Sequence, residues 1–220
     1  MANASRRSVV LGLMGVAAVS ACSKADDKND STDSSSTSAD ATGSAAPTSG
    51  TSSTTSSAAF DISSVPVSTA TLGEFPYLEL PSGYTNKGFG VTDKASARFP
   101  FWVNGTAHWV NGRFHGEDFS VDAGKDYSAD EVTQGFDAEI RRLGGVRVSS
   151  GRIPNDVIKG WGDEITQGFV SGLGDVYNYP ATVWIVRRPE SNIWVHMATT
   201  TASGGFVVGQ ESSAQTSSAS

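Results

Sequence analysis

The sequence predicts an α+β fold, in which an antiparallel sheet carries one main amphipathic helix on one face. Three observations lead to this prediction. Residues 129–143 repeat apolar side chains at a helical period, residues 99–110 hold a hairpin signal, and residues 181–200 hold two apolar runs around a short polar loop. All five tryptophans and all ten phenylalanines lie between residues 60 and 210, so this region is expected to form one globular domain.

Residues 1–21 have the pattern of a signal peptide. Arg6 and Arg7 form a basic start, and the apolar run at 9–19 is about half of the ~20 residues that a transmembrane helix needs. The paired arginines also resemble a twin-arginine export signal, so both the Sec and the twin-arginine routes stay open.

Cys22 is the only cysteine, so it cannot form an intramolecular disulfide. It follows small residues in Val-Ser-Ala-Cys, which resembles the bacterial lipobox. That resemblance implies cleavage before Cys22 and acylation of this residue, which would anchor the protein in a membrane. Ser23, rather than Asp, follows the cysteine, and this sorting pattern favours the outer membrane. The expected location is therefore the cell envelope, with the membrane contacted through acylated Cys22.

Residues 22–59 follow as a predicted disordered tether. Serine and threonine make up 19 of the 37 residues at 23–59, which leaves too little apolar surface to offset the entropy of ordering. The ends of such a coil would lie roughly 35 Å apart. Residues 211–220 have the same composition and are expected to form a disordered tail.

The charge balance excludes one class of partner. The net charge is −7, and removal of residues 1–21 takes away two of the 16 basic residues and none of the 23 acidic ones, which leaves −9. An acidic chain is not expected to bind nucleic acid or to dock electrostatically on anionic lipid.

Residues 104–105 and 111–112 repeat the Asn-Gly pair within Trp-Val-Asn-Gly. Asn104-Gly105 is flanked by apolar runs and predicts a type I′ hairpin turn. The second pair would leave very short strands if it also turned. Gly112 is therefore interpreted as a bulge or bend inside one strand, residues 106–121.

The helix at 129–143 begins with the capping box Ser128-x-x-Glu131 and ends at Gly144-Gly145. A short strand at 146–148 should follow. The apolar stripe of the helix consists of Val132, Phe136, Ile140 and Leu143.

The C-terminal part predicts strands at 181–188 and 192–200, with a possible further strand at 204–209. The glycine-rich stretch between 153 and 179 has weak helical signals, with one short helix possible at 155–161.

Residues 75–84 (FPYLELPSGY) resemble the opening of the N-terminal domain of OmpA-family envelope lipoproteins, which lies upstream of a peptidoglycan-binding domain. The resemblance covers 75–210 and implies a stand-alone copy of that domain, without catalytic residues, cofactor or ligand. The peptidoglycan-binding pattern itself is absent, so wall binding is not carried over. Further matches follow in the same order at residues 101–102, 143–146, 151–154, 168–169, 183–188 and 193–195.

Motifs for catalysis are missing from the chain. It has no G-x-S-x-G elbow, and its one cysteine is assigned to the anchor. The adjacent acidic pairs Glu117-Asp118 and Asp163-Glu164 would point to opposite faces of a strand. The prediction is a non-enzyme without a cofactor.

The histidines 108, 115 and 196 could supply a zinc site only if a bulge brought the first two to one strand face, because they are an odd number of residues apart. Structural histidines are favoured, and no metal site is predicted.

Three residues are proposed as binding candidates: Trp161, which stands among glycines where exposure is expected, Arg152, and Trp109, one of several strand tryptophans. The predicted function is a non-catalytic interaction or structural module with an envelope protein or glycan partner. The alternative is a small ligand-binding or hydrolytic periplasmic domain with a site near residues 160–174.

Overall fold

The computed structural model describes residues 60–86, 88 and 90–212. The predicted signal peptide, Cys22, the tether and residues 213–220 lie outside the described residues. Glu211, assigned by the sequence to a tail, instead ends a strand, and Asn192 Nδ2 donates to its carboxylate at 2.7 Å.

Seven strands form one sheet in the order β1-β3-β7-β6-β5-β4, and β2 pairs with β3 beside β1. Every pairing between these described strands is antiparallel, so the predicted antiparallel sheet is confirmed. The last two strands of the chain, β6 and β7, thus lie at the centre of the sheet. The strands are β1 (Tyr84–Thr85), β2 (Val91–Val103), β3 (Thr106–Val121), β4 (Val146–Gly151), β5 (Ala181–Val186), β6 (Ile193–Thr199) and β7 (Ser203–Glu211).

The β2–β3 hairpin turns at Asn104-Gly105, with φ of 50° and 83°, as a type I′ turn requires. The strand expected at 106–121 is confirmed as β3, but a bulge at Gly112 within it is wrong, because the register shift lies on β2, between Lys94 and Ala97. Glycine is needed at position 112 because of a close contact with β7. A Cβ there would lie 1.9 Å from the carbonyl oxygen of Gln210, so β7 approaches too closely for any side chain.

The described helices are α1 (Ala129–Arg142), α2 (Asn155–Gly160), α3 (Asp163–Thr166) and the 3-10 turn η1 (Ile62–Ser64). Ser128 caps α1 as predicted, since its Oγ accepts from Glu131 N at 3.2 Å. The reciprocal bond of a capping box, from the Ser128 N–H to the Glu131 side chain, is replaced by bonds to other partners. Glu131 bonds Lys125 Nζ at 2.6 Å, and the Ser128 N–H donates to Tyr84 Oη.

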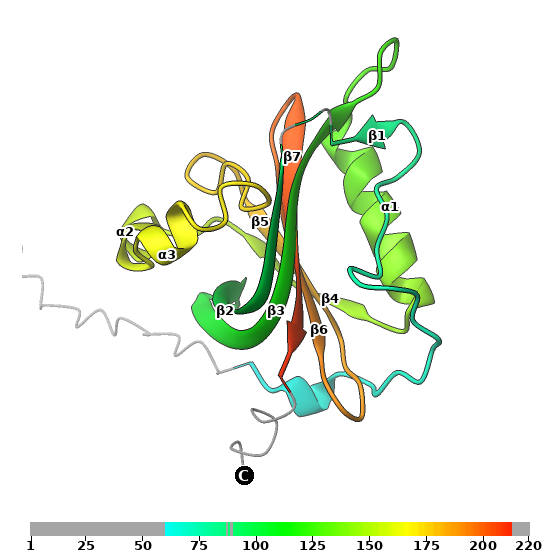
Figure 1. Cartoon of the computed structure of the whole chain (residues 1–220), viewed down its shortest axis with the longest axis vertical. Coiled ribbons are helices and arrows are strands. Elements are labelled where there is room, and N and C mark those ends of the chain that lie inside the picture. Colours follow the sequence, from blue (N-terminus) through cyan, green and yellow to red (C-terminus); the bar gives the residue numbers. More distant parts are fainter. Residues whose placement is uncertain (1–59, 87, 89, 213–220) are drawn as a thin grey trace, which may run out of the picture. The chain divides into compact units, whose positions relative to one another are not determined.

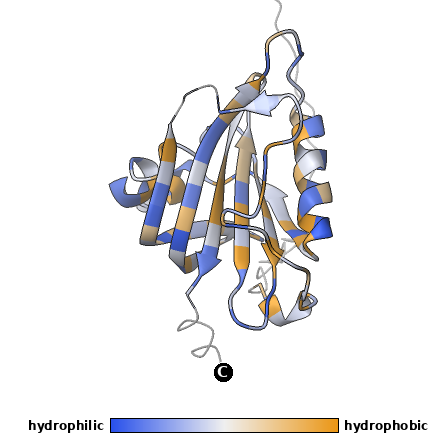
Figure 2. Cartoon of the chain, turned by 45° about the vertical axis from the view of Figure 1, so that its right-hand side comes forward, coloured by the Kyte–Doolittle hydropathy of each residue, from blue (hydrophilic) through white to orange (hydrophobic). Residues whose placement is uncertain are grey.

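Both faces of the sheet are covered, and not only the face on which a helix was expected. Figure 1 shows α1 on one side of the strands and α2 with α3 on the other. The buried residues of α1 join β-strand residues such as Trp184 and Phe206 in one core cluster. In Figure 2 the side of α1 away from the sheet is hydrophilic.

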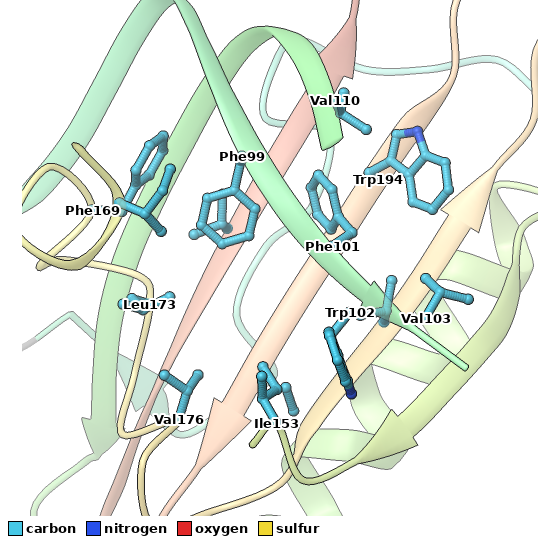
Figure 3. Packing of buried hydrophobic residues seen from close by; sticks show 14 of the residues in the cluster. Phe99, Phe101, Trp102, Val103, Val110, Ile153, Phe169, Leu173, Val176 and Trp194 are labelled. Atoms are coloured by element: carbon cyan, nitrogen blue, oxygen red, sulfur yellow. The ribbon is translucent and has the colours of Figure 1, made fainter. Parts of the chain in front are cut away.

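The second core lies where β2 curls across the sheet and makes it a half-barrel. β2 contacts β4, β5 and β6 without pairing with them. Phe99 and Phe101 of β2 pack within 5.0 Å of each other between ring centroids, and Phe101 lies 5.4 Å from Trp194 of β6 (Figure 3). Phe169 closes this core from the glycine-rich segment, 5.0 Å from Phe99.

Candidate functional site

β4 is the last strand of the sheet and has a partner on one side only. It pairs with β5 from Val146↔Ile185 to Gly151↔Ala181, with an irregularity between Arg147 and Ser149. In an antiparallel strand every second residue turns its N–H and C=O away from the partner. β4 is exposed or half-buried throughout, whereas β5 is buried throughout, so the free edge of β4 faces solvent.

Two depressions border this edge. The larger, about 670 Å³, lies beside the end of β4 and the start of α2, and the smaller, about 430 Å³, lies beside the start of β4 and the segment that begins at Phe60. Asn104 and Val148 line both of them, so the two depressions follow one strand edge. The larger depression is lined by Trp102, Asn104, Gly105, residues 148–152, Pro154 and Val157.

The tip of the β2–β3 hairpin contacts β4 where the two depressions meet the strand. The backbone N–H of Asn104 donates to Ser149 Oγ at 3.4 Å, near the upper limit for such a bond. Because β2 stops at Val103 and does not pair with β4, the half-barrel stays open along this line.

Of the devices that protect natural edge strands, β4 carries the register irregularity between Arg147 and Ser149. The charged side chain of β4, Arg147, is tied back to the α1 face, where its guanidinium bonds the Asp137 carboxylate. On the opposite edge, β2 carries Pro100 and the bulge that follows Lys94. The β4 edge is therefore the better template for an added strand.

Arg152 follows β4 directly and lines the larger depression. It is exposed, and its Nη2 donates to the backbone carbonyl of Asn178. Among the residues that the structure describes, Arg152 has no carboxylate within the 4.0 Å of an ion pair. Of the three predicted binding residues, Arg152 is the one that borders the site.

Trp161 does not have the predicted exposure. Only 6% of it is accessible, and it packs in the core beneath β2 together with Ile158 and Ile165. Its Nε1 is buried without a partner in the described part of the chain. Gly160 ends α2 and Gly162 precedes α3, so Trp161 lies between two short helices and its side chain packs in the core.

Trp109 lies on the other face of the hairpin from Phe101, half-buried, and lines neither depression. The guanidinium of Arg98 lies 4.6 Å from its ring centroid and also pairs with Glu164 at 3.2 Å. Trp109 therefore has a structural role and is not brought together with Arg152.

The three histidines occupy separate environments. His108 stacks on Trp194 at 4.6 Å between centroids, and burial lowers the pKa of its imidazole. His115 lies on the opposite face, 2.8 Å from Asp93 Oδ1, because β3 has no bulge to bring it round. His196 is buried beside Phe99. Within the described ranges no group of three His, Cys, Asp or Glu side chains is placed to hold a metal ion.

The segment 160–174, the alternative site, mainly fills the core. Ile165, Phe169 and Leu173 are buried there. A depression of about 280 Å³ does lie at its end, lined by Asp118 and Asp175 among others. Burial raises the pKa of Asp118, and the hydrogen bond from Gly172 N–H at 3.0 Å opposes that rise.

No histidine lines this depression, and its described hydroxyls are bonded locally. Thr200 Oγ1 donates to the carbonyl of Ser203 at 3.1 Å and accepts from the backbone of the same turn. Among the described residues, this depression therefore has no hydroxyl paired with a histidine.

No family model, no curated protein and no solved structure matches this chain. No helix among the described residues has both the length and the apolar character needed to cross a membrane.

The edge position of β4 is not predicted by the sequence, which indicates only a short strand at 146–148. Strand order depends on which elements pair at a distance. Nothing local to these residues indicates that they lie at an edge.

Proposed function

We propose that this chain is a non-catalytic module of the bacterial cell envelope that binds an extended peptide segment of a partner protein along the free edge of β4. The observation that carries the proposal is the unpaired edge between two depressions. Extended peptides are commonly bound by addition to an exposed sheet edge. Main-chain hydrogen bonds then supply affinity, and pockets for alternate side chains supply specificity.

A peptide suits this edge better than a glycan does. Sugar recognition of the kind considered for the tryptophans needs an exposed aromatic face. Trp102, the aromatic residue at the larger depression, is only 8% accessible. The Ser149 hydroxyl already accepts from the Asn104 N–H. The Ser150 hydroxyl bonds Thr182 Oγ1 at 3.1 Å, so the strand backbone is the main set of polar groups along the edge, and it matches a peptide chain.

The proposal retains the anchor and the envelope location. Residues 1–21 would direct export by the Sec or twin-arginine route, and acylated Cys22 would hold the domain at the outer membrane behind its tether. The resemblance to the N-terminal domain of OmpA-family lipoproteins, with α1 as the main helix on one face, agrees with a binding module without catalysis. A ligand-binding or hydrolytic site near residues 160–174 has weaker support, because that segment is mostly core.

The test selects ten-residue peptides from a random library displayed on phage, using the full chain as target. Amide hydrogen exchange of the chain is then measured with and without a selected synthetic peptide. We expect added protection at every second amide of β4, because these groups would bond the new strand. Protection elsewhere with none on β4, or no enrichment of any peptide, would overturn the proposal.

Two proline variants sharpen this test. Ser149→Pro and Ser150→Pro each remove one backbone N–H, and only one of the two N–H groups can face the free edge. The variant at the outward position should keep the thermal midpoint near that of the parent and lose peptide binding. Retained binding in a folded outward variant would count against strand addition.

A further inference from the structure

Arg152 belongs to the described arginines without a carboxylate partner, like Arg187 and Arg188, and among the arginines it is the one that lines the larger depression. Arg98, Arg142 and Arg147 each pair with a carboxylate, at Glu164, Glu139 and Asp137. The Arg152 guanidinium bonds only a backbone carbonyl among the described residues. Its positive charge is therefore open to a ligand.

The carbonyl that holds Arg152 is itself fixed. Asn178 donates from its side-chain amide to both carboxylate oxygens of Asp175, at 3.0 and 2.9 Å, and from its backbone N–H at 3.2 Å. In this turn the Asp175 carboxylate is hydrogen-bonded to Asn178, and the Asn178 carbonyl accepts from Arg152. An arginine has five N–H donors, so one bond orients the guanidinium and leaves the other donors for a partner.

The larger depression is positive within an acidic protein. Arg152 is the one charged residue among its described lining residues, while the whole chain carries a net charge of −7. Trp102 and Val157 supply apolar walls, and Ser149 and Ser150 supply hydroxyls. The depression thus offers one cation, placed directly beyond the last strand residue, Gly151.

We propose that the segment bound along β4 carries an acidic side chain, and that its carboxylate pairs with Arg152 at the end of the groove. This inference rests on the proposed function, because it assumes a peptide added to β4. It makes the partner an acidic extended segment. Arginine suits this pairing because its planar donors can meet both oxygens of a carboxylate.

The experiment uses the full chain and the peptides selected on it, synthesised with amidated C-termini so that side chains supply the only carboxylates. We expect each strong binder to contain Asp or Glu. Changing that residue to Asn or Gln should weaken binding about tenfold, as should Arg152→Gln. In a double-mutant cycle the two changes together should cost little more than either alone.

Arg142→Gln is the matched control, since it removes the same charge from α1, where Arg142 pairs with Glu139. It should leave the affinity for the peptide unchanged. Arg152→Glu should reject the acidic peptide and accept the peptide in which its acid is replaced by Lys. Acceptance would also show that the variant is folded.

Failure of this inference is distinct from failure of strand addition. Binders without acidic residues, or fully additive losses in the cycle, would overturn the role of Arg152 while β4 amides still gained protection. Binding that required a free C-terminal carboxylate would overturn the side-chain assignment. Absence of β4 protection would instead remove the proposed function itself.

Discussion

His196 sits on β6 with one ring nitrogen bonded and the other unpartnered among the described residues. Its Nε2 lies 3.0 Å from the carbonyl of Leu173, and the residue is 1% accessible. The bond ties the glycine-rich segment to the sheet and places the ring proton on Nε2. Burial keeps the ring neutral, because a second proton, on Nδ1, would place a charge in an apolar core.

This burial should make the stability of the domain pH-dependent. Burial lowers the pKa of His196 from 6.5 to about 4, so the unfolded chain binds the proton first as pH falls. The stabilisation is complete above pH 6.5 and is lost progressively toward pH 4, by on the order of 3 kcal/mol. Urea denaturation between these pH values should show the fall.

The variant His196→Gln should have the flatter pH profile. His108→Gln is the comparison, since burial also lowers the pKa of His108 but Glu211 opposes that shift, and it should flatten the profile less. An unchanged profile in His196→Gln would show that His196 is not the titrating group.

Arg152 and Trp161 show how far the environment of a single residue can be predicted from its neighbours in the sequence. Arg152, predicted from the sequence as a binding residue, lines the larger depression beside the β4 edge. Trp161 was expected to be exposed because glycines surround it, yet it lies between α2 and α3 and its side chain is buried in the core. Local composition predicts the irregular backbone at such a position. It does not predict which distant surface the side chain meets.

At the scale of elements, signals that act over a few residues were dependable. The cap at Ser128, the turn at Asn104-Gly105 and the short helix α2 are formed by interactions between near neighbours. Gly112 was misinterpreted because its cause is the backbone of β7, about one hundred residues away along the chain. The edge position of β4 is a pairing property of the same long-range kind.

β7 gives a testable case at this scale, because it lies between β3 and β6 at the centre of the sheet. A Cβ at Gly209 would lie 2.4 Å from the Phe114 ring and 3.2 Å from the Phe101 ring. Gly209→Ala should therefore destabilise the fold by about 1–3 kcal/mol through overpacking, as measured by urea unfolding.

Gly160→Ala provides the matched control. An added Cβ there meets nothing within 4 Å, and the residue ends α2, so alanine should be neutral or stabilise by up to about 1 kcal/mol. Equal stability of Gly209→Ala and the parent would mean that the rings have room to move.

At the scale of the whole molecule, Cys22 should decide where the domain resides. With the parent protein, cells fed labelled palmitate should yield a labelled product in the membrane fraction. Cys22→Ala should abolish the label and release the protein from that fraction, because in the proposed arrangement the acyl chains on Cys22 would supply the anchor. Ser20→Thr, a change near the cleavage site that keeps the cysteine, serves as control and should retain labelling. Undiminished labelling of Cys22→Ala would contradict lipidation.

The sequence by itself determined the antiparallel sheet, the helix that begins after Ser128 and its cap, the first hairpin turn, and most of the strands that build the sheet. These depend on periodicity, on caps and on turn residues, all of which act between neighbours. Tertiary structure alone decided that both sheet faces are covered, that Trp161 is buried, and that β4 ends the sheet beside Arg152. Those features follow from pairing and packing between residues far apart in the chain, and no local pattern records them.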